Sequence, residues 1–210
     1  VMQNIIDDKT LDVSQGIIHH SEGVDLLPSN IELSGFEVRL INAMSRERVL
    51  KTYVNEVKKN YDYVLIDCMP SLGMITINAL AAADSVIIPT QPHYLSAKGL
   101  ELLLRSVSMV KRQINPKLRI DGILMTMVMP RTNISKEITA TVKSAYGKKI
   151  KVFDTEIPHS IRAVEATAEG KSIFAYDKSG KVAAAYEQLG KEVAEIGEKQ
   201  RNQNRADRIR

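Results

Sequence analysis

The residues with the clearest chemical potential lie in the stretch YDYVLIDCMPSLG, residues 61–73. An apolar run there ends abruptly at Asp67, and Pro70 and Gly73 predict a loop before a helix that begins near Met74. Parallel α/β sheets bind ligands beyond the carboxyl ends of their strands, which is where this aspartate would lie. Its carboxylate could hold a magnesium ion, directly or through a water molecule, or it could simply cap the following turn.

Three other candidate sites gain no support from their surroundings in the sequence. His19 and His20 have no cysteine or carboxylate at metal-ligand spacing. Cys68 has no histidine near it, so we expect a small buried thiol rather than a nucleophile. The segment Gly170-Lys171-Ser172 ends like the phosphate loop G-x-x-x-x-G-K-[ST], but Glu165 stands where the first glycine should be. That segment also follows a predicted helix rather than a strand, so we reject it as a phosphate loop.

Short apolar runs that alternate with helical segments must position these residues. The runs are rich in β-branched residues or leucine and alternate little, as is typical of strands buried on both faces. The predicted strands are Val24–Leu27, Tyr63–Asp67, Ser85–Pro89, Arg119–Val128 and Lys151–Ile157. Apolar residues at helical spacing predict helices over 49–57 and 100–114, and a last helix over 182–196. This order predicts an α/β fold with a mostly parallel sheet and helices on both of its faces.

Composition and charge restrict the class of protein. The chain has 210 residues, of which 44% are hydrophobic and 26% charged, so we expect a folded domain over residues 1–197. One cysteine and the lack of any long apolar run indicate a cytoplasmic protein that does not span a membrane. Residues 198–210 carry five basic and two acidic side chains, which supply most of the net charge of +4. This basic tail is either a frayed, solvated end or an accessory contact for DNA or protein.

Several collinear stretches resemble the ParA family of chromosome- and plasmid-partition ATPases, which are related to MinD. The longest is YDYVLIDCMPSLGMITINALAAADSVIIPTQ at residues 61–91, and VDLLPSNIELSG at 24–35 resembles the family's preceding segment. The stretch from Gly122 to RTNISKE, and IPHSIRAVEATAEGKSIFAY at 157–176, match later landmarks in the same order. The resemblance covers roughly residues 16–189. It implies a P-loop NTPase fold of the ParA/MinD type.

The resemblance implies a role for five residues. Asp67 matches the Walker B acid, the catalytic residue that would hold Mg²⁺, with water between them, beside ATP. Thr126 and Pro158 match positions that flank the adenine, although His159-Ser160 stands where relatives have Arg-Asn. Arg162, and more weakly Lys171, match basic positions that contact DNA without sequence preference. The implied partners are DNA, a centromere-binding ParB-like protein and a second copy in a nucleotide-bound homodimer. The implied location is the cytoplasm, in association with the nucleoid.

In the family, the phosphate loop precedes the point that matches Val1. We therefore expect a fragment whose fold lacks the first strand, the phosphate loop and the first helix, and which does not hydrolyse ATP alone. The alternative function is a non-catalytic ParA-like module that binds DNA or a partner. A single cysteine argues against an iron protein of the nitrogenase type, and Gln200–Arg210 offers only Ile209 to a membrane. The lack of tyrosine after Tyr186 argues against a tyrosine kinase of this fold. The replicon and the stimulating partner stay open.

Overall fold

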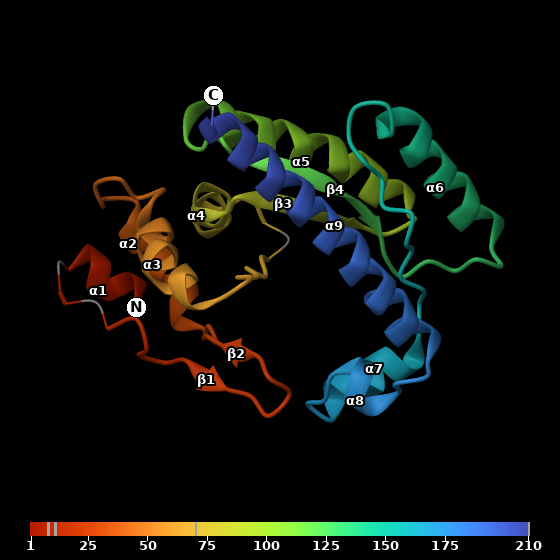
Figure 1. Cartoon of the computed structure of the whole chain (residues 1–210), viewed down its shortest axis with the longest axis horizontal. Coiled ribbons are helices and arrows are strands. Elements are labelled where there is room, and N and C mark those ends of the chain that lie inside the picture. The colour runs from red at the N-terminus through yellow and green to blue at the C-terminus, as the bar shows by residue number, and fades with distance from the viewer. Residues whose placement is uncertain (8, 11, 70, 210) are drawn as a thin grey trace. The chain divides into compact units, whose positions relative to one another are not determined.

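The computed structural model describes the chain apart from residues 8, 11, 70 and 210 (Figure 1). Pro70 and Arg210 therefore lie outside the described residues, as do the side chains of residues 204–209. The internal contacts divide the chain into two compact units. The first comprises residues 1–85 and 103–119, and the second comprises residues 86–102 and 120–210. The single domain expected over residues 1–197 stays a prediction.

The first unit is mainly helical. Its elements are α1 (Met2–Ile6), β1 (Ile18–His19), β2 (Asp25–Leu26), α2 (Glu32–Leu40), α3 (Val49–Val57), the 3-10 helix η1 (Lys58–Asn60), α4 (Met74–Ala82) and the second half of α5 (Tyr94–Gln113). The predicted stripe of α3 is confirmed, because Val49, Tyr53, Val54 and Val57 are all buried. Three of these pack with Ala82 of α4, and we call this group the α3–α4 core. The predicted start of α4 at Met74 is also confirmed.

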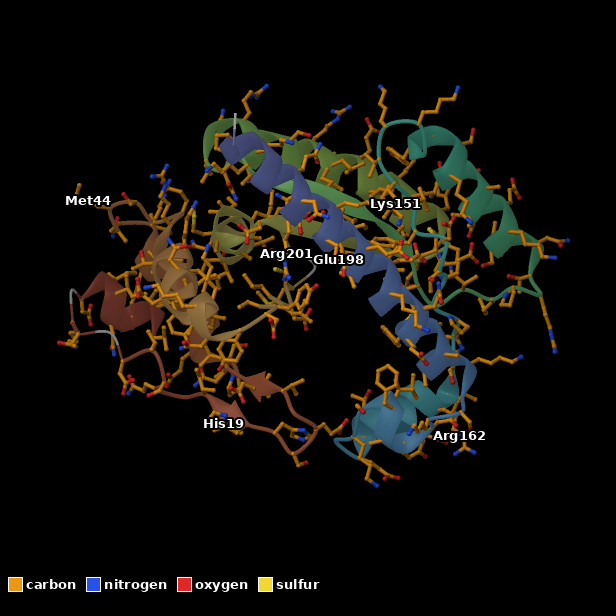
Figure 2. All side chains as sticks on the ribbon, in the orientation of Figure 1. His19, Met44, Lys151, Arg162, Glu198 and Arg201 are labelled. Carbon is orange, nitrogen blue, oxygen red and sulfur yellow. The ribbon has the colours of Figure 1, made fainter. Side chains whose placement is uncertain are left out.

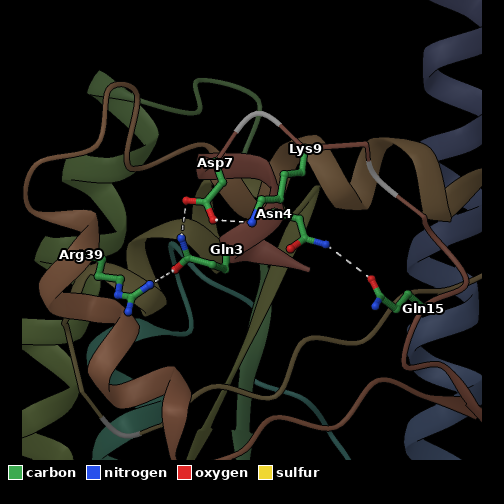
Figure 3. Close-up of polar contacts among 6 residues, drawn as sticks. All are labelled: Gln3, Asn4, Asp7, Lys9, Gln15 and Arg39. Carbon is green, nitrogen blue, oxygen red and sulfur yellow. Dashed lines mark hydrogen bonds and ion pairs between the residues drawn. The ribbon is translucent and has the colours of Figure 1, made fainter.

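Polar contacts attach the short helix α1 to its neighbours (Figure 3). The Gln3 amide accepts a hydrogen bond from Arg39 of α2 at 2.9 Å and donates one to Asp7 at 2.6 Å. Asn4 donates to Gln15 at 3.5 Å. Because α1 buries no residue completely, these contacts, together with the packing of Ile5 on the α3–α4 core, fix its place.

Buried Asn78 of α4 connects this helix to the start of α3. Its amide nitrogen donates to the carbonyl oxygens of Arg46 and Met74 at 2.7 and 3.0 Å. Its amide oxygen accepts from the backbone N–H of Leu50 at 3.1 Å. The first N–H groups of a helix have no partner within the helix. Asn78 therefore supplies a cap for α3 that Arg48, its N-cap residue, does not provide through its own side chain.

Two strand predictions for the first unit need correction. Residues 24–27 contribute only Asp25–Leu26, which pairs antiparallel with β1 in a hairpin. Gly23 has a φ of 81°, which permits the turn that closes this hairpin. Tyr63–Asp67 is not a strand, because residues 61–69 form no ladder with any described segment. An apolar, β-branched run becomes a strand only when a neighbour pairs with its backbone.

Most residues of the parallel sheet belong to the second unit. Strand β3 (Ser85–Thr90) pairs with β4 (Arg119–Met125) in the same direction, since hydrogen bonds join Arg119 to Asp84 and Thr126 to Thr90. The predicted strand Lys151–Ile157 is not a regular strand, because Val152 alone among its residues forms a ladder bridge, a parallel one to Ile123 of β4. A second parallel bridge joins Val128 to Pro158, beyond the end of β4, which stops at Met125 and not at the predicted Val128. A Cβ added at Gly122 would lie 2.7 Å from the Phe153 ring and 2.9 Å from the Lys151 carbonyl oxygen. Glycine is thus required for this close approach.

Four helices complete the second unit, together with the first turns of α5. They are α6 (Asn133–Tyr146), α7 (Ile161–Ala168), α8 (Ile173–Tyr176) and α9 (Lys181–Ile209). Helix α9 crosses the sheet (Figure 1), and its residues Val182, Leu189 and Val193 pack with Leu124 and Phe153. Helix α9 continues through Ile209, beyond the end of its apolar stripe, and the amide of Gln200 donates to Asp121 at 3.1 Å, while the role of the basic tail stays a prediction. Lysine, glutamate, glutamine and arginine favour helix without an apolar stripe. Among the described helices, none is long and apolar enough to cross a bilayer.

Candidate functional site

Asp67 lies in the irregular segment 61–69 of the first unit. Its side chain is exposed, and so are the preceding Tyr63, Val64 and Leu65, the last at 91%. Ile66 is the exception, because it packs against the α3–α4 core. The carboxylate was expected at the end of a buried strand. Instead, its position depends on the packing of Ile66 and on what holds the two ends of the segment, at Tyr61 and before α4.

The loop after Asp67 leads into the N-terminus of α4. The N–H of Gly73 donates to the Ser71 hydroxyl at 3.2 Å, and the Thr76 hydroxyl donates to the Ser71 carbonyl at 2.6 Å. Glu37 of α2 places its carboxylate at the same helix end, where it accepts from the N–H of Ile75 at 3.5 Å. A Cβ at Gly73 would collide with this carboxylate. The loop is therefore fixed at its α4 end by local hydrogen bonds and by Glu37.

The charges around Asp67 leave its carboxylate available to bind a cation. In the described part of the chain, no cation lies within ion-pair distance of it. Partial loss of hydration, followed by the Asp67 charge, raises the pKa of the neighbouring Cys68 thiol. Cys68 is nevertheless exposed, so the expected buried thiol is wrong. The raised pKa disfavours the thiolate, which agrees with the expectation that Cys68 is not a nucleophile.

Asp67 fits a magnesium ion only as one ligand among several. No group of three histidine, cysteine, aspartate or glutamate side chains is placed to hold a metal anywhere in the described residues. Magnesium is usually bound by one or two carboxylates together with waters and phosphate oxygens. A single exposed carboxylate therefore fits Mg²⁺ carried by a phosphate ligand and does not suit a site built from protein groups alone.

Thr126 and Pro158 lie together at the carboxyl end of the parallel sheet in the second unit. The N–H of Thr126 donates to the carbonyl of Thr90 at 2.9 Å. Two residues further, the N–H of Val128 donates to Ile157 at 3.0 Å, and Val128 accepts from the N–H of His159 at 3.0 Å. Both predicted residues are half-buried. They thus border the edge where open α/β sheets bind ligands.

Sequence reasoning missed three residues at this edge. Thr90, which is buried, ends β3, and the amide of Gln91 donates to the Met127 sulfur at 3.2 Å. Met127 has a φ of 52° and is exposed, which turns the chain away from the strand direction directly after Thr126. The dipeptide Thr-Gln at the end of a predicted strand was a usable signal. The left-handed conformation at Met127 had no signal in the sequence, because methionine rarely adopts this conformation.

Arg162 of α7 is an exposed cation (Figure 2), and so is Lys171, which follows the end of α7. The guanidinium of Arg162 lies 3.9 Å from the Glu165 carboxylate and 5.9 Å from the centre of the Tyr176 ring. The ammonium of Lys171 lies 2.8 Å from Glu169, and this hydrogen bond raises the Lys171 pKa. Both cations therefore combine exposure with one acidic neighbour.

Gly170 confirms that Gly170-Lys171-Ser172 is not a phosphate loop. Its φ is 63°, and the following N–H of Lys171 donates to the Ala166 carbonyl at 3.0 Å. This is a helix C-terminus ended by a left-handed glycine. Ser172 then caps α8 by accepting from the N–H of Ala175 at 3.1 Å. The three residues thus connect two helices.

The five predicted site residues fall into two sets. Asp67 belongs to the first unit, while Thr126, Pro158, Arg162 and Lys171 belong to the second. Within the second unit, Thr126 and Pro158 lie on adjacent segments of the sheet, and Arg162 and Lys171 lie in and directly after α7. Their functional roles stay predictions.

Comparison with known proteins decides the family. Residues 1–120 match a family model, AAA_31, described as an AAA domain. The chain is 44% identical over 176 residues to the sporulation initiation inhibitor protein Soj of Bacillus subtilis, an alignment that covers 84% of this chain and 69% of Soj. It is 36% identical over 195 residues to the chromosome partitioning protein ParA of Myxococcus xanthus, covering 92% of this chain and 67% of that protein. The chain belongs to the ParA family of partition ATPases. The resemblance found in the sequence is thereby confirmed.

Solved structures show the same fold as this ParA-family chain. Cobyrinic acid a,c-diamide synthase from Mycobacterium smegmatis matches with a TM-score of 0.73 and 31% identity, covering 88% of this chain and 67% of that chain. A structure of that synthase with bound ADP and magnesium matches with a TM-score of 0.69. The predicted α/β fold class, a P-loop NTPase of the ParA/MinD type with a parallel sheet and helices, is confirmed.

Proposed function

We propose that the chain acts in a ParA-like ATPase of chromosome or plasmid partition, which binds DNA without sequence preference as an ATP-dependent dimer. The identity to Soj, 44% over 176 residues, is the observation that carries this proposal. The match spans most of the chain, including the segment of Asp67. In this proposal, a ParB-like centromere-binding protein stimulates ATP hydrolysis, and the protein works in the cytoplasm on the nucleoid.

We assign roles in nucleotide use to three residues. Bound Mg²⁺ would neutralise phosphate charge in the phosphoryl transfer. Asp67 would orient the water ligands of this ion, and its exposed carboxylate, which has no ion-pair partner among the described side chains, suits that role. Thr126 and Pro158 would border the adenine, since they lie at the carboxyl edge of the sheet. The structure of the synthase with ADP and magnesium supports nucleotide and magnesium use by proteins of this fold.

DNA would contact the cations of α7 and of the turn that follows it. Arg162 and Lys171 are exposed, and their ion pairs with Glu165 and Glu169 are the kind that contributes little energy in water. Replacing these carboxylates with DNA phosphates as the partners of the two cations therefore costs little free energy. Contacts of this kind would give binding that depends on salt and hardly on sequence.

The test is DNA binding by the protein with unrelated duplexes, measured with and without ATP and Mg²⁺ over a range of salt concentrations. Arg162→Glu should weaken all duplexes about equally and reduce the log–log salt slope by roughly 0.9 for each phosphate that the protein no longer neutralises. Lys191→Glu is the matched control, because Lys191 is an exposed cation of α9 that also pairs with a glutamate. An equal effect of the two variants would remove Arg162 from the DNA surface.

Nucleotide dependence separates this function from the alternative. Asp67→Asn should abolish the response of DNA binding to Mg²⁺ and ATP while it leaves the fold intact, because Asp67 is exposed. DNA binding that ignores nucleotide in the unmodified protein would instead favour the non-catalytic DNA- or partner-binding module.

A further inference from the structure

Asp25 of β2 joins two separate parts of the first unit. One of its carboxylate oxygens lies 2.6 Å from Nδ1 of His19, which stands opposite it in the hairpin. The other oxygen accepts a hydrogen bond from the hydroxyl of Tyr61, also at 2.6 Å. The hydrogen bonds from Tyr61 and then from His19 lower the pKa of Asp25. The carboxylate is thus ionised at neutral pH and uses both oxygens to connect the hairpin with Tyr61.

Tyr61 begins the segment that carries Asp67. Its ring packs against the α3–α4 core, and so does Ile66, the residue directly before Asp67. The intervening Asp62, Tyr63, Val64 and Leu65 are exposed and form no strand pairing with described residues. A change at Tyr61 therefore acts on the same core that holds Ile66.

We propose that Asp25 and Tyr61 are positioning residues for Asp67: the Asp25–Tyr61 hydrogen bond fixes the start of the segment 61–69 and so restricts where the Asp67 carboxylate can lie. The role in magnesium binding rests on the proposed function, but the restriction of the segment does not. Asp25 and Tyr61 act through the backbone and through the packing of Ile66, without contact to the ion. His19 completes the connection by holding the other oxygen of Asp25 in place.

A second tyrosine of the same core provides a matched control. The hydroxyl of Tyr53 donates to the carbonyl of Val13 at 3.0 Å, so it fixes the loop before β1 and not the segment 61–69. Tyr61→Phe and Tyr53→Phe each remove one hydroxyl and keep the ring in the core. If both hydroxyls have only a structural role, the two variants should change the mobility of the segment 61–69 equally. If Tyr61 alone positions the segment, only Tyr61→Phe should change it.

Cys68 makes the segment directly observable. It is the only cysteine, it is exposed, and it follows Asp67. A nitroxide attached to its thiol reports by electron paramagnetic resonance how freely this position moves. Tyr61→Phe and Asp25→Asn should each increase the label's mobility, and the double variant should add little to either single change. Tyr53→Phe should leave the spectrum unchanged. An equal change with Tyr53→Phe, or none with Tyr61→Phe and Asp25→Asn, would overturn the proposal.

The second readout uses unlabelled protein and MgCl₂ at fixed ATP. Tyr61→Phe and Asp25→Asn should raise the Mg²⁺ concentration for half-maximal ATP-dependent DNA binding by about 2- to 12-fold, the factor that corresponds to one net hydrogen bond. Tyr53→Phe should not shift it. A mobile label with an unshifted Mg²⁺ requirement would refute the link to Asp67 function. If the unmodified protein gives no Mg²⁺ or ATP response, the proposed function fails, and the label alone decides whether the two residues position the segment.

Discussion

Glu192 of α9 offers the sharpest test of how the second unit is held together. This side chain is only 11% exposed. Its carboxylate accepts from the hydroxyl and the N–H of Thr155 at 2.6 and 2.9 Å, and from the N–H of Asp154 at 3.3 Å. The ammonium of Lys151 lies 3.2 Å away. One carboxylate thus connects α9 to the segment beside β4.

The expected cost of losing this carboxylate follows from its partners. Glu192→Ala leaves buried donors of Thr155 without an acceptor, and such groups cost about 1–3 kcal/mol each. We expect a loss of about 2–4 kcal/mol in the free energy of unfolding, or roughly 4–16 °C in Tm for a chain of this length. Glu192→Gln keeps one oxygen and should cost about half as much. Glu187→Gln, an exposed partner of Lys191 on the same helix, should cost at most about 0.5 kcal/mol.

The pH dependence gives an independent check. Burial alone would raise the pKa of Glu192, but the hydrogen bonds from Thr155, Lys151 and Asp154 outweigh it and lower the pKa. A lowered pKa in the folded state adds stability above the unfolded value of about 4.3, and this stability is lost as pH falls through the folded value. Urea unfolding monitored by circular dichroism from pH 7 to pH 3 should therefore show a steeper loss for the unmodified protein than for Glu192→Gln. Equal losses, or equal Tm shifts for Glu192→Ala and Glu187→Gln, would refute the reasoning.

Three further changes test other parts of the structure. Gly122→Ala should lower the free energy of unfolding by about 1–3 kcal/mol in urea titrations, because its methyl group meets the Phe153 ring and the Lys151 carbonyl. Asn78→Ala should cost about 2–4 kcal/mol in the same assay, because it leaves the N–H of Leu50 and the carbonyl of Arg46 without this hydrogen-bond partner. The control Asn55→Ala, on the exposed face of α3, should cost less than about 1 kcal/mol. Glu169→Gln should tighten DNA binding at low salt if Lys171 contacts phosphate, because the change removes a competing carboxylate; unchanged or weaker binding would place Lys171 outside the DNA surface.

Helix α3 was predictable because its signal is local. In α3 the spacing of Val49, Tyr53 and Val57 alone indicates which face is buried, and the structure confirms it. The end of α9 was not predictable from the same rule. Its apolar stripe stops near residue 197, but the helix continues through Ile209, because lysine, glutamate, glutamine and arginine favour helix and the amide of Gln200 donates to Asp121 at 3.1 Å. Amphipathic spacing therefore locates the buried part of a helix and says little about where the helix ends.

The strands were predictable only where a partner exists. The predicted strands Ser85–Pro89 and Arg119–Val128 pair with each other over the observed strands Ser85–Thr90 and Arg119–Met125. The run Tyr63–Asp67 has an equally apolar composition, yet it forms no ladder with the described residues. Composition shows that a segment suits a sheet, but the hydrogen bonds that make it a strand come from another part of the chain.

The same distinction applies to the candidate site. Asp67 could be chosen from its place after an apolar run, and Thr126 and Pro158 from the collinear motifs. The groups that hold these residues could not be chosen in this way, because they lie far along the chain: 36 residues separate Asp25 from Tyr61, and 37 separate Thr155 from Glu192. Neither pair has a motif of its own. Chemistry-bearing residues are thus visible in the sequence, whereas the carboxylates that position strands and loops around them become visible only when the chain is folded.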